Sequence, residues 1–188
     1  MKEIIEKIYH QHDVVCNQKY GDNLPYSFHL KAVEAQGEKF IHLIENTQIE
    51  NPDNYRSYSV SLLYIVRIAL SGHDLLEDAR LSYNDIKNLV CKEFGNTIAE
   101  EILAEIIYCL TDEKGKNRAE RKNEKYYNEL KENKLAIFVK LADIAANTLY
   151  SKLTGSSMYE KYKKEFPAFK EKVYVEEYEE FFQYVNSL

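Results

Sequence analysis

The segment SYSVSLLYIVRIALSGHDLLED, residues 57–78, decides how this chain folds. Over its first fifteen residues, apolar side chains would cover nearly the whole circumference of a helix, and such a helix belongs in the interior of a domain. The segment then continues directly into His73 and Asp74. It therefore predicts a central helix that leads into titratable side chains.

Helical patterns also flank this segment. Ser82 and Thr97 each open a capping box at the start of a helix, and Gly95 is a typical helix stop between them. Apolar periodicity and these signals together predict helices over the following ranges: 2–16, 27–46, 57–71, 82–95, 97–110, 119–130, 134–152 and 157–186, the last interrupted near Pro167. We expect an all-α fold, a single compact domain over residues 1–188 built as a bundle of about seven helices, with a C-terminal helical extension at about 157–188.

Composition limits the partners of the protein. The 188 residues hold 25 Lys and Arg against 31 Asp and Glu, and the net charge of −6 argues against a clamp for nucleic-acid polymers. No stretch has the roughly 18 uncharged residues of a membrane span, and the amino terminus lacks the apolar region of a secretory signal. The three cysteines form no Cys-x-x-Cys pair, which favours reduced thiols. We expect a cytoplasmic protein with no membrane or nucleic-acid partner, and the sequence leaves the oligomeric state open.

Pairs of polar residues at helical spacing mark a candidate site. His73 and Glu77 are four residues apart, as are Asp74 and Asp78. On a helical backbone each pair lies on one face with neighbouring side chains. The pairs follow directly after the most apolar segment of the chain.

The segment KLADIAAN repeats this spacing with Asp143 and Asn147. Carboxylates in or beside apolar helices are costly unless they are paired or bound to a metal. Together with His29, His73 and Asp74, Asp143 would complete a shell of two imidazoles and two carboxylates. That shell suits a six-coordinate divalent ion such as Mn²⁺ or Fe²⁺, with two positions left for water and a phosphate oxygen.

The same residues resemble a known family. His29, His73-Asp74 and Asp143 resemble, in that order, the H…HD…D signature of the HD-domain metal-dependent phosphohydrolases. The closer resemblance is to the (p)ppGpp hydrolase domain of the RelA/SpoT alarmone enzymes and to their small stand-alone relatives. It covers about residues 10–170 and is carried by these segments: KYG (19–21), PYSFH (25–29), GHDLLED (72–78), FG (94–95), LTD (110–112) and VKLAD (139–143), followed by Asn147.

This resemblance implies a reaction and the residues that perform it. It implies an HD-domain fold and removal of pyrophosphate from the 3′ position of guanosine tetra- or pentaphosphate. One divalent ion is implied, Mn²⁺ first and Fe²⁺ or Co²⁺ as alternatives. The implied metal ligands are His29, His73, Asp74 and Asp143, and the implied catalytic residues are Glu77 and Asp78, which handle the attacking water, with Asn147 beside the metal. An Asn in a buried helix can also be a structural hydrogen-bonding group.

A second set of residues is expected to contact the substrate. Its members are Lys19, Tyr26, Arg118, Arg121, Tyr162 and Lys163. Lys19 matches the position of a basic residue that packs on the nucleotide base in the family. The two arginines lie in the basic stretch 114–125, and Arg binds phosphate in a bidentate manner. The alternatives are a solvated charged face for the basic stretch and simple packing for the aromatic residues of the tail.

Three departures from the family bear on the substrate. Leu30 stands where the family usually has Pro, and Ile144 stands where it commonly has Arg or Lys. His29 and His73 are also further apart than in typical alarmone hydrolases, with the excess expected in a loop around 47–56. The alternatives are a nucleotidase or cyclic-nucleotide phosphodiesterase on the same fold, and a non-catalytic nucleotide-binding module.

Overall fold

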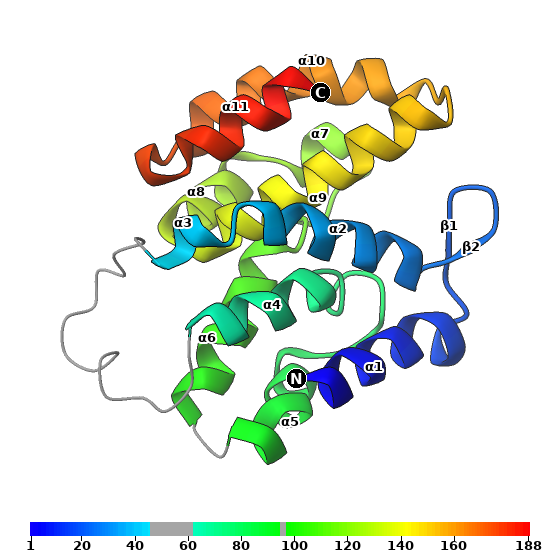
Figure 1. Ribbon diagram of the computed structural model, residues 1–188, viewed down its shortest axis with the longest axis vertical. Coiled ribbons are helices and arrows are strands. Elements are labelled where there is room, and N and C mark those ends of the chain that lie inside the picture. Colours follow the sequence, from blue (N-terminus) through cyan, green and yellow to red (C-terminus); the bar gives the residue numbers. More distant parts are fainter. Residues whose placement is uncertain (46–61, 95–96) are drawn as a thin grey trace.

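The computed structural model describes residues 1–45, 62–94 and 97–188, and these are mostly helical (Figure 1). In chain order the elements are α1 (Lys2–His10), a π-helical turn (Gln11–Val15), β1 (Lys19–Tyr20), β2 (Leu24–Pro25), α2 (Ser27–Lys39), α3 (His42–Glu45), α4 (Leu62–Gly72), α5 (Tyr83–Phe94), α6 (Thr97–Leu110), α7 (Arg118–Arg121), α8 (Glu124–Glu132), α9 (Lys134–Leu153), α10 (Met158–Val173), a 3₁₀ turn (Glu176–Tyr178) and α11 (Glu179–Ser187). The predicted all-α class is confirmed. The predicted loop around 47–56 and the helix stop at Gly95 lie outside the described residues.

Helices α4 and α9 form the interior of the fold. Helix α9 packs against α2, α4, α6, α8, α10 and α11, and every residue from Leu135 to Ala146 except Ile144 is buried. Helix α4 packs against α1, α2, α6 and α9, and its last five residues, 68–72, are buried. The central position predicted from the apolar segment is therefore confirmed for its described part.

One cluster of buried hydrophobic side chains runs from Ile4 in α1 to Val185 in α11. Phe181 of α11 stacks on Phe40 with ring centroids 4.2 Å apart, and Tyr178 is fully buried. Figure 1 shows α10 and α11 side by side, covering α9. The C-terminal helices therefore share the core of α2 and α9.

The tail helix is not interrupted at Pro167, so this prediction is wrong. Helix α10 continues through the proline to Val173. Pro167 is exposed, and a single lost N–H donor on a solvated face does not end the helix here. The chain turns instead at Tyr174, whose backbone angles are φ −57° and ψ 134°.

Two other predicted helices are divided, so the fold has more and shorter helices than expected. The segment 27–46 leaves helical geometry at Phe40, where φ is −116° and ψ is 11°. The segment 119–130 breaks at Lys122 and restarts at α8, because the side chain of Asn123 accepts a hydrogen bond from Tyr126 N–H at 3.2 Å. Asn is a preferred residue for this N-terminal cap.

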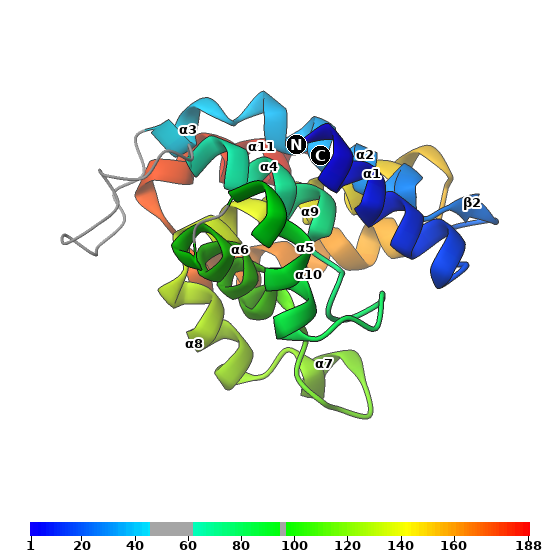
Figure 2. The same cartoon turned by 90° about the horizontal axis from the view of Figure 1, so that it is seen from below.

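A small hairpin connects the π-helical turn to α2. In β1 and β2, Lys19 pairs with Pro25 and Tyr20 with Leu24, and Figure 2 shows the hairpin projecting from one end of the molecule. Gly21 has a φ of 53°, and a Cβ there would overlap the hydroxyl group of Tyr150. The tight turn places the Tyr20 ring over the start of α2.

Among the described helices, none combines the length and the apolar character that crossing a membrane requires.

Candidate metal centre

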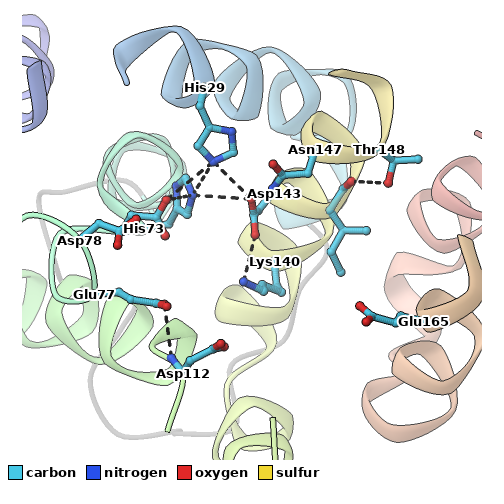
Figure 3. Close-up of polar contacts among 12 residues, drawn as sticks. His29, His73, Glu77, Asp78, Asp112, Lys140, Asp143, Asn147, Thr148 and Glu165 are labelled. Atoms are coloured by element: carbon cyan, nitrogen blue, oxygen red, sulfur yellow. Dashed lines mark hydrogen bonds and ion pairs between the residues drawn. The ribbon is translucent and has the colours of Figure 1, made fainter. Parts of the chain in front are cut away.

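Three parts of the fold bring the predicted ligands together (Figure 3). His29 lies in the first turn of α2, His73 and Asp74 directly follow α4, and Asp143 lies in the middle of α9. Since α4 and α9 both pack against α2, these residues meet in the interior. The two histidines are only 2% and 3% exposed.

Their donor atoms converge on one point. His29 Nε2 lies 3.3 Å from His73 Nε2, 3.7 Å from Asp74 Oδ2 and 3.4 Å from Asp143 Oδ1. His73 Nε2 lies 2.9 Å from Asp74 Oδ2 and 3.8 Å from Asp143 Oδ1. One ligand atom each from His29, His73 and Asp74 falls within 4.8 Å of the other two. This group can hold a metal ion, and Asp143 lies against both of its imidazoles.

Contacts behind the two imidazoles fix their orientation. His73 Nδ1 lies 3.0 Å from the carbonyl oxygen of Leu70. Because a carbonyl only accepts, Nδ1 carries the proton and the Nε2 lone pair of the neutral ring faces the group. The His29 ring stacks on Tyr20 with centroids 4.7 Å apart, and its buried Nδ1 has no hydrogen-bond partner in the described part of the chain.

The charges of the group favour a cation. Burial raises the pKa of Asp74, but the His73 imidazole outweighs burial and holds that pKa below its ordinary value. Burial lowers the pKa of His73, yet the carboxylates of Asp74 and Asp143 outweigh it and raise that pKa to about 9. The carboxylates thus stay ionised and draw positive charge into the group. A divalent ion satisfies the same requirement.

Lys140 supplies a further positive charge that the sequence analysis missed. Its Nζ donates to Asp143 Oδ2 at 2.9 Å, while Asp143 Oδ1 accepts from Asn147 Nδ2 at 2.5 Å. Burial lowers the pKa of Lys140, but the Asp143 carboxylate outweighs burial and raises it well above its ordinary value. Lys140 therefore holds one oxygen of Asp143, and the other oxygen faces the imidazoles.

Replacing Lys140 with Met is expected to destabilise the metal-free protein by about 3–5 kcal/mol, because it removes the ammonium group that pairs with Oδ2 of the buried Asp143 carboxylate. Denaturant unfolding in the presence of a chelator measures this loss. The control is Lys134→Met on the same helix, whose ion pair with Glu177 is about one-third exposed and is worth about 1 kcal/mol or less. Equal losses in the two variants would contradict the buried ion pair.

Tyr26 connects the candidate metal-binding group of His29, His73 and Asp74, hereafter the metal group, to Asp78. Its hydroxyl donates to Asp74 Oδ2 at 2.5 Å and lies 3.1 Å from Asp78 Oδ2. Its ring stacks on His12 with centroids 4.9 Å apart. Gln18 completes the network: its Nε2 donates to Asp78 Oδ2 at 2.9 Å, and its Oε1 lies 2.7 Å from His12 Nδ1. These contacts hold Asp78 beside Asp74.

Glu77 faces the same region from the turn that also carries Asp74 and Asp78. Glu77 Oε2 accepts from Asp112 N–H at 3.5 Å, and Arg121 lies 4.0 Å from Glu77 and 3.9 Å from Asp112. Partial burial and the Asp112 carboxylate raise the pKa of Glu77. A carboxylate with a raised pKa is better suited to accept a proton from water near neutral pH.

A polar cavity of about 220 Å³ opens onto the group. Four of the six residues predicted for substrate contact line this cavity, namely Tyr26, Arg118, Arg121 and Tyr162. The other two, Lys19 and Lys163, are exposed and do not line it, so the prediction is not supported for them. Arg118 donates to Glu165 Oε2 at 3.0 Å and lies over the Tyr162 ring at 5.6 Å. Tyr26 is only 8% exposed, so its ring has little surface for a base.

Asn147 and Tyr20 form a pair beside the cavity. The Tyr20 hydroxyl donates to Asn147 Oδ1 at 2.8 Å, and the amide of Asn147 binds Asp143 as described above. Asn147 therefore orients the Asp143 carboxylate and faces the same space as the imidazoles. The sequence pattern predicted Asn147 for the site but not Tyr20.

Comparisons with protein-family models and with curated proteins gave no match. The candidate site therefore stands on its geometry. That geometry is a group of two buried imidazoles and the Asp74 carboxylate, with Asp143 against both imidazoles, beside a cavity lined with basic and acidic side chains.

Proposed function

We propose that this protein is a metal-dependent phosphohydrolase that acts on a nucleotide. One observation carries the proposal: His29 and His73 Nε2, Asp74 Oδ2 and Asp143 Oδ1 converge beside a cavity that His29, Asp74 and Asp143 line. Nitrogen and oxygen donors without thiolates favour Mn²⁺, with Fe²⁺ and Co²⁺ as alternatives. A divalent ion held there would polarise a phosphoryl oxygen and make bound water more acidic.

The surrounding residues have separate roles in this proposal. Glu77 and Asp78 accept and relay the proton of the attacking water, since both carboxylates line the cavity beside Asp74. Asn147 and Lys140 hold the Asp143 carboxylate in place. Arg118 and Arg121 face the same space and would neutralise phosphate charge.

The favoured substrate is guanosine tetra- or pentaphosphate, from which the 3′-pyrophosphate is removed. Its support is the resemblance of the H…HD…D series to alarmone hydrolases, together with a cavity that combines a metal group with several basic side chains. In this proposal Tyr162, which lines the cavity, stacks on the base.

A panel of nucleotides tests this function. The metal-stripped protein is incubated with guanosine 3′,5′-bis(diphosphate), guanosine monophosphates and cyclic GMP, each with Mn²⁺ or with a chelator. We expect release of pyrophosphate from the first substrate alone, and only with Mn²⁺. Turnover confined to monophosphates or to the cyclic nucleotide would replace the proposed substrate, and binding without turnover would contradict the enzyme.

A further inference from the structure

The cavity holds four basic side chains, and one of them differs from the rest. Lys140, Arg118 and Arg121 have the carboxylate neighbours described above, at 2.9–4.0 Å. Within the described ranges, Lys122 has no carboxylate within 4.0 Å of its ammonium group. It is therefore the basic group of the cavity that lacks a close counter-charge in the described protein.

The surroundings of Lys122 make this lack of a partner costly. Its Nζ lies over the Tyr126 ring, 5.7 Å from the centroid. Burial lowers the pKa of Lys122 to about 8, and the charges of Lys140 and Arg118 lower it further, outweighing the more weakly acting carboxylates of Asp112 and Asp143. Lys122 is half-buried, and an ammonium group that has lost part of its hydration and has no carboxylate in contact is stabilised when an anion joins it.

Lys122 also stands where two cavities meet. A second cavity of about 640 Å³ adjoins the polar one, and Arg118, Lys122, Ile144 and Tyr162 line both. Tyr127, Phe166 and Phe169 supply much of the remaining wall of the second cavity. A ligand that binds at the metal centre through one phosphate and extends into the second cavity would run along the four shared residues, and Lys122 is the one among them with a charge that no carboxylate pairs within 4.0 Å in the described ranges.

We propose that Lys122 binds a second phosphate group, linked to the one at the metal centre. The protein then favours ligands with adjoining phosphates over monophosphates. This inference deepens the proposed function and rests on it for the metal-bound phosphate. Lys binds phosphate as a point charge without fixed bidentate geometry, which suits a group at the junction of two cavities.

Calorimetry with inorganic pyrophosphate and inorganic phosphate on the Mn²⁺-loaded protein tests this role. Lys122→Met keeps most of the side-chain packing and removes the charge. We expect its affinity for pyrophosphate to fall about tenfold to hundredfold, because a charge-assisted hydrogen bond is lost. Affinities for phosphate and for Mn²⁺ stay unchanged. Lys122→Arg retains most of the pyrophosphate affinity. Lys116→Met, at an exposed position outside both cavities, changes the affinity for neither phosphate nor pyrophosphate.

The outcomes separate this inference from the proposed function. Unchanged pyrophosphate affinity in Lys122→Met, an equal loss for phosphate and pyrophosphate, or loss of Mn²⁺ binding would each overturn the role of Lys122. A selective loss of pyrophosphate binding in a protein that turns over no nucleotide would support the phosphate-binding role of Lys122 and refute the proposed phosphohydrolase activity.

Discussion

Replacing Asp74 with Ala is expected to reduce the metal content from about one equivalent to below about a tenth and to lower turnover by about a thousandfold. The Asp74 carboxylate lies against both imidazoles and carries the ionised charge that favours a cation. A metal ion supplies several kcal/mol of transition-state stabilisation, and each 1.36 kcal/mol is a factor of ten in rate.

Metal analysis after dialysis against a fixed free Mn²⁺ concentration measures this loss. Asp22→Ala, at an exposed hairpin position, is the matched control and keeps both metal and activity. An unfolding curve for Asp74→Ala shows that the variant is folded, and Asp74→Asn tests the charge at nearly constant shape. Full metal content in a folded Asp74→Ala protein would contradict the ligand assignment.

Replacing Glu77 with Gln is expected to slow turnover about a hundredfold to a thousandfold while metal content stays unchanged, because general-base catalysis contributes about that much. Glu77 lines the cavity without joining the His29, His73 and Asp74 group. Its side chain is kept close to Asp112 and Arg121.

The pH profile gives this variant a second readout. A carboxylate accepts a proton only when ionised, so the wild-type rate rises with pH through the pKa of Glu77 and then levels. Since burial and Asp112 raise that pKa, we expect the rate to rise at a pH above the ordinary pKa range of a glutamate side chain. Glu77→Gln loses this limb of the profile, whereas Glu160→Gln, exposed on α10, keeps it. Loss of metal in Glu77→Gln, or an unchanged rate, would refute the assigned role.

The sequence was sufficient for features that depend on local patterns. The apolar segment before His73 predicted the buried α4, and the Ser82 capping box is present, with Ser82 N–H donating to Asp85 at 2.8 Å and Asp85 N–H to Ser82 Oγ at 3.3 Å. The ordered series of His29, His73, Asp74 and Asp143 indicated one site through its resemblance to the H…HD…D signature, whereas helical periodicity only predicted the elements that carry these residues.

Features that depend on the path of the chain between helices were not predictable in this way. After the π-helical turn that holds His12, the chain bends at Asn17, whose φ is 48°, and the segment beyond the bend brings Gln18 to Asp78 and the Tyr26 ring to His12. Lys122 enters the cavity because the predicted helix breaks at that residue. Lys140 had a usable signal, since a charged residue three positions before Asp143 in an apolar helix is placed to pair with it.

A crystal structure grown with Mn²⁺, with data collected at the manganese absorption edge, tests the central claim most directly. We expect a single strong anomalous peak within about 2 Å of His29 Nε2, His73 Nε2 and one carboxylate oxygen each of Asp74 and Asp143. An anomalous map with no peak between these four side chains, or with its peak at other residues, would contradict the metal centre and the reaction proposed from it.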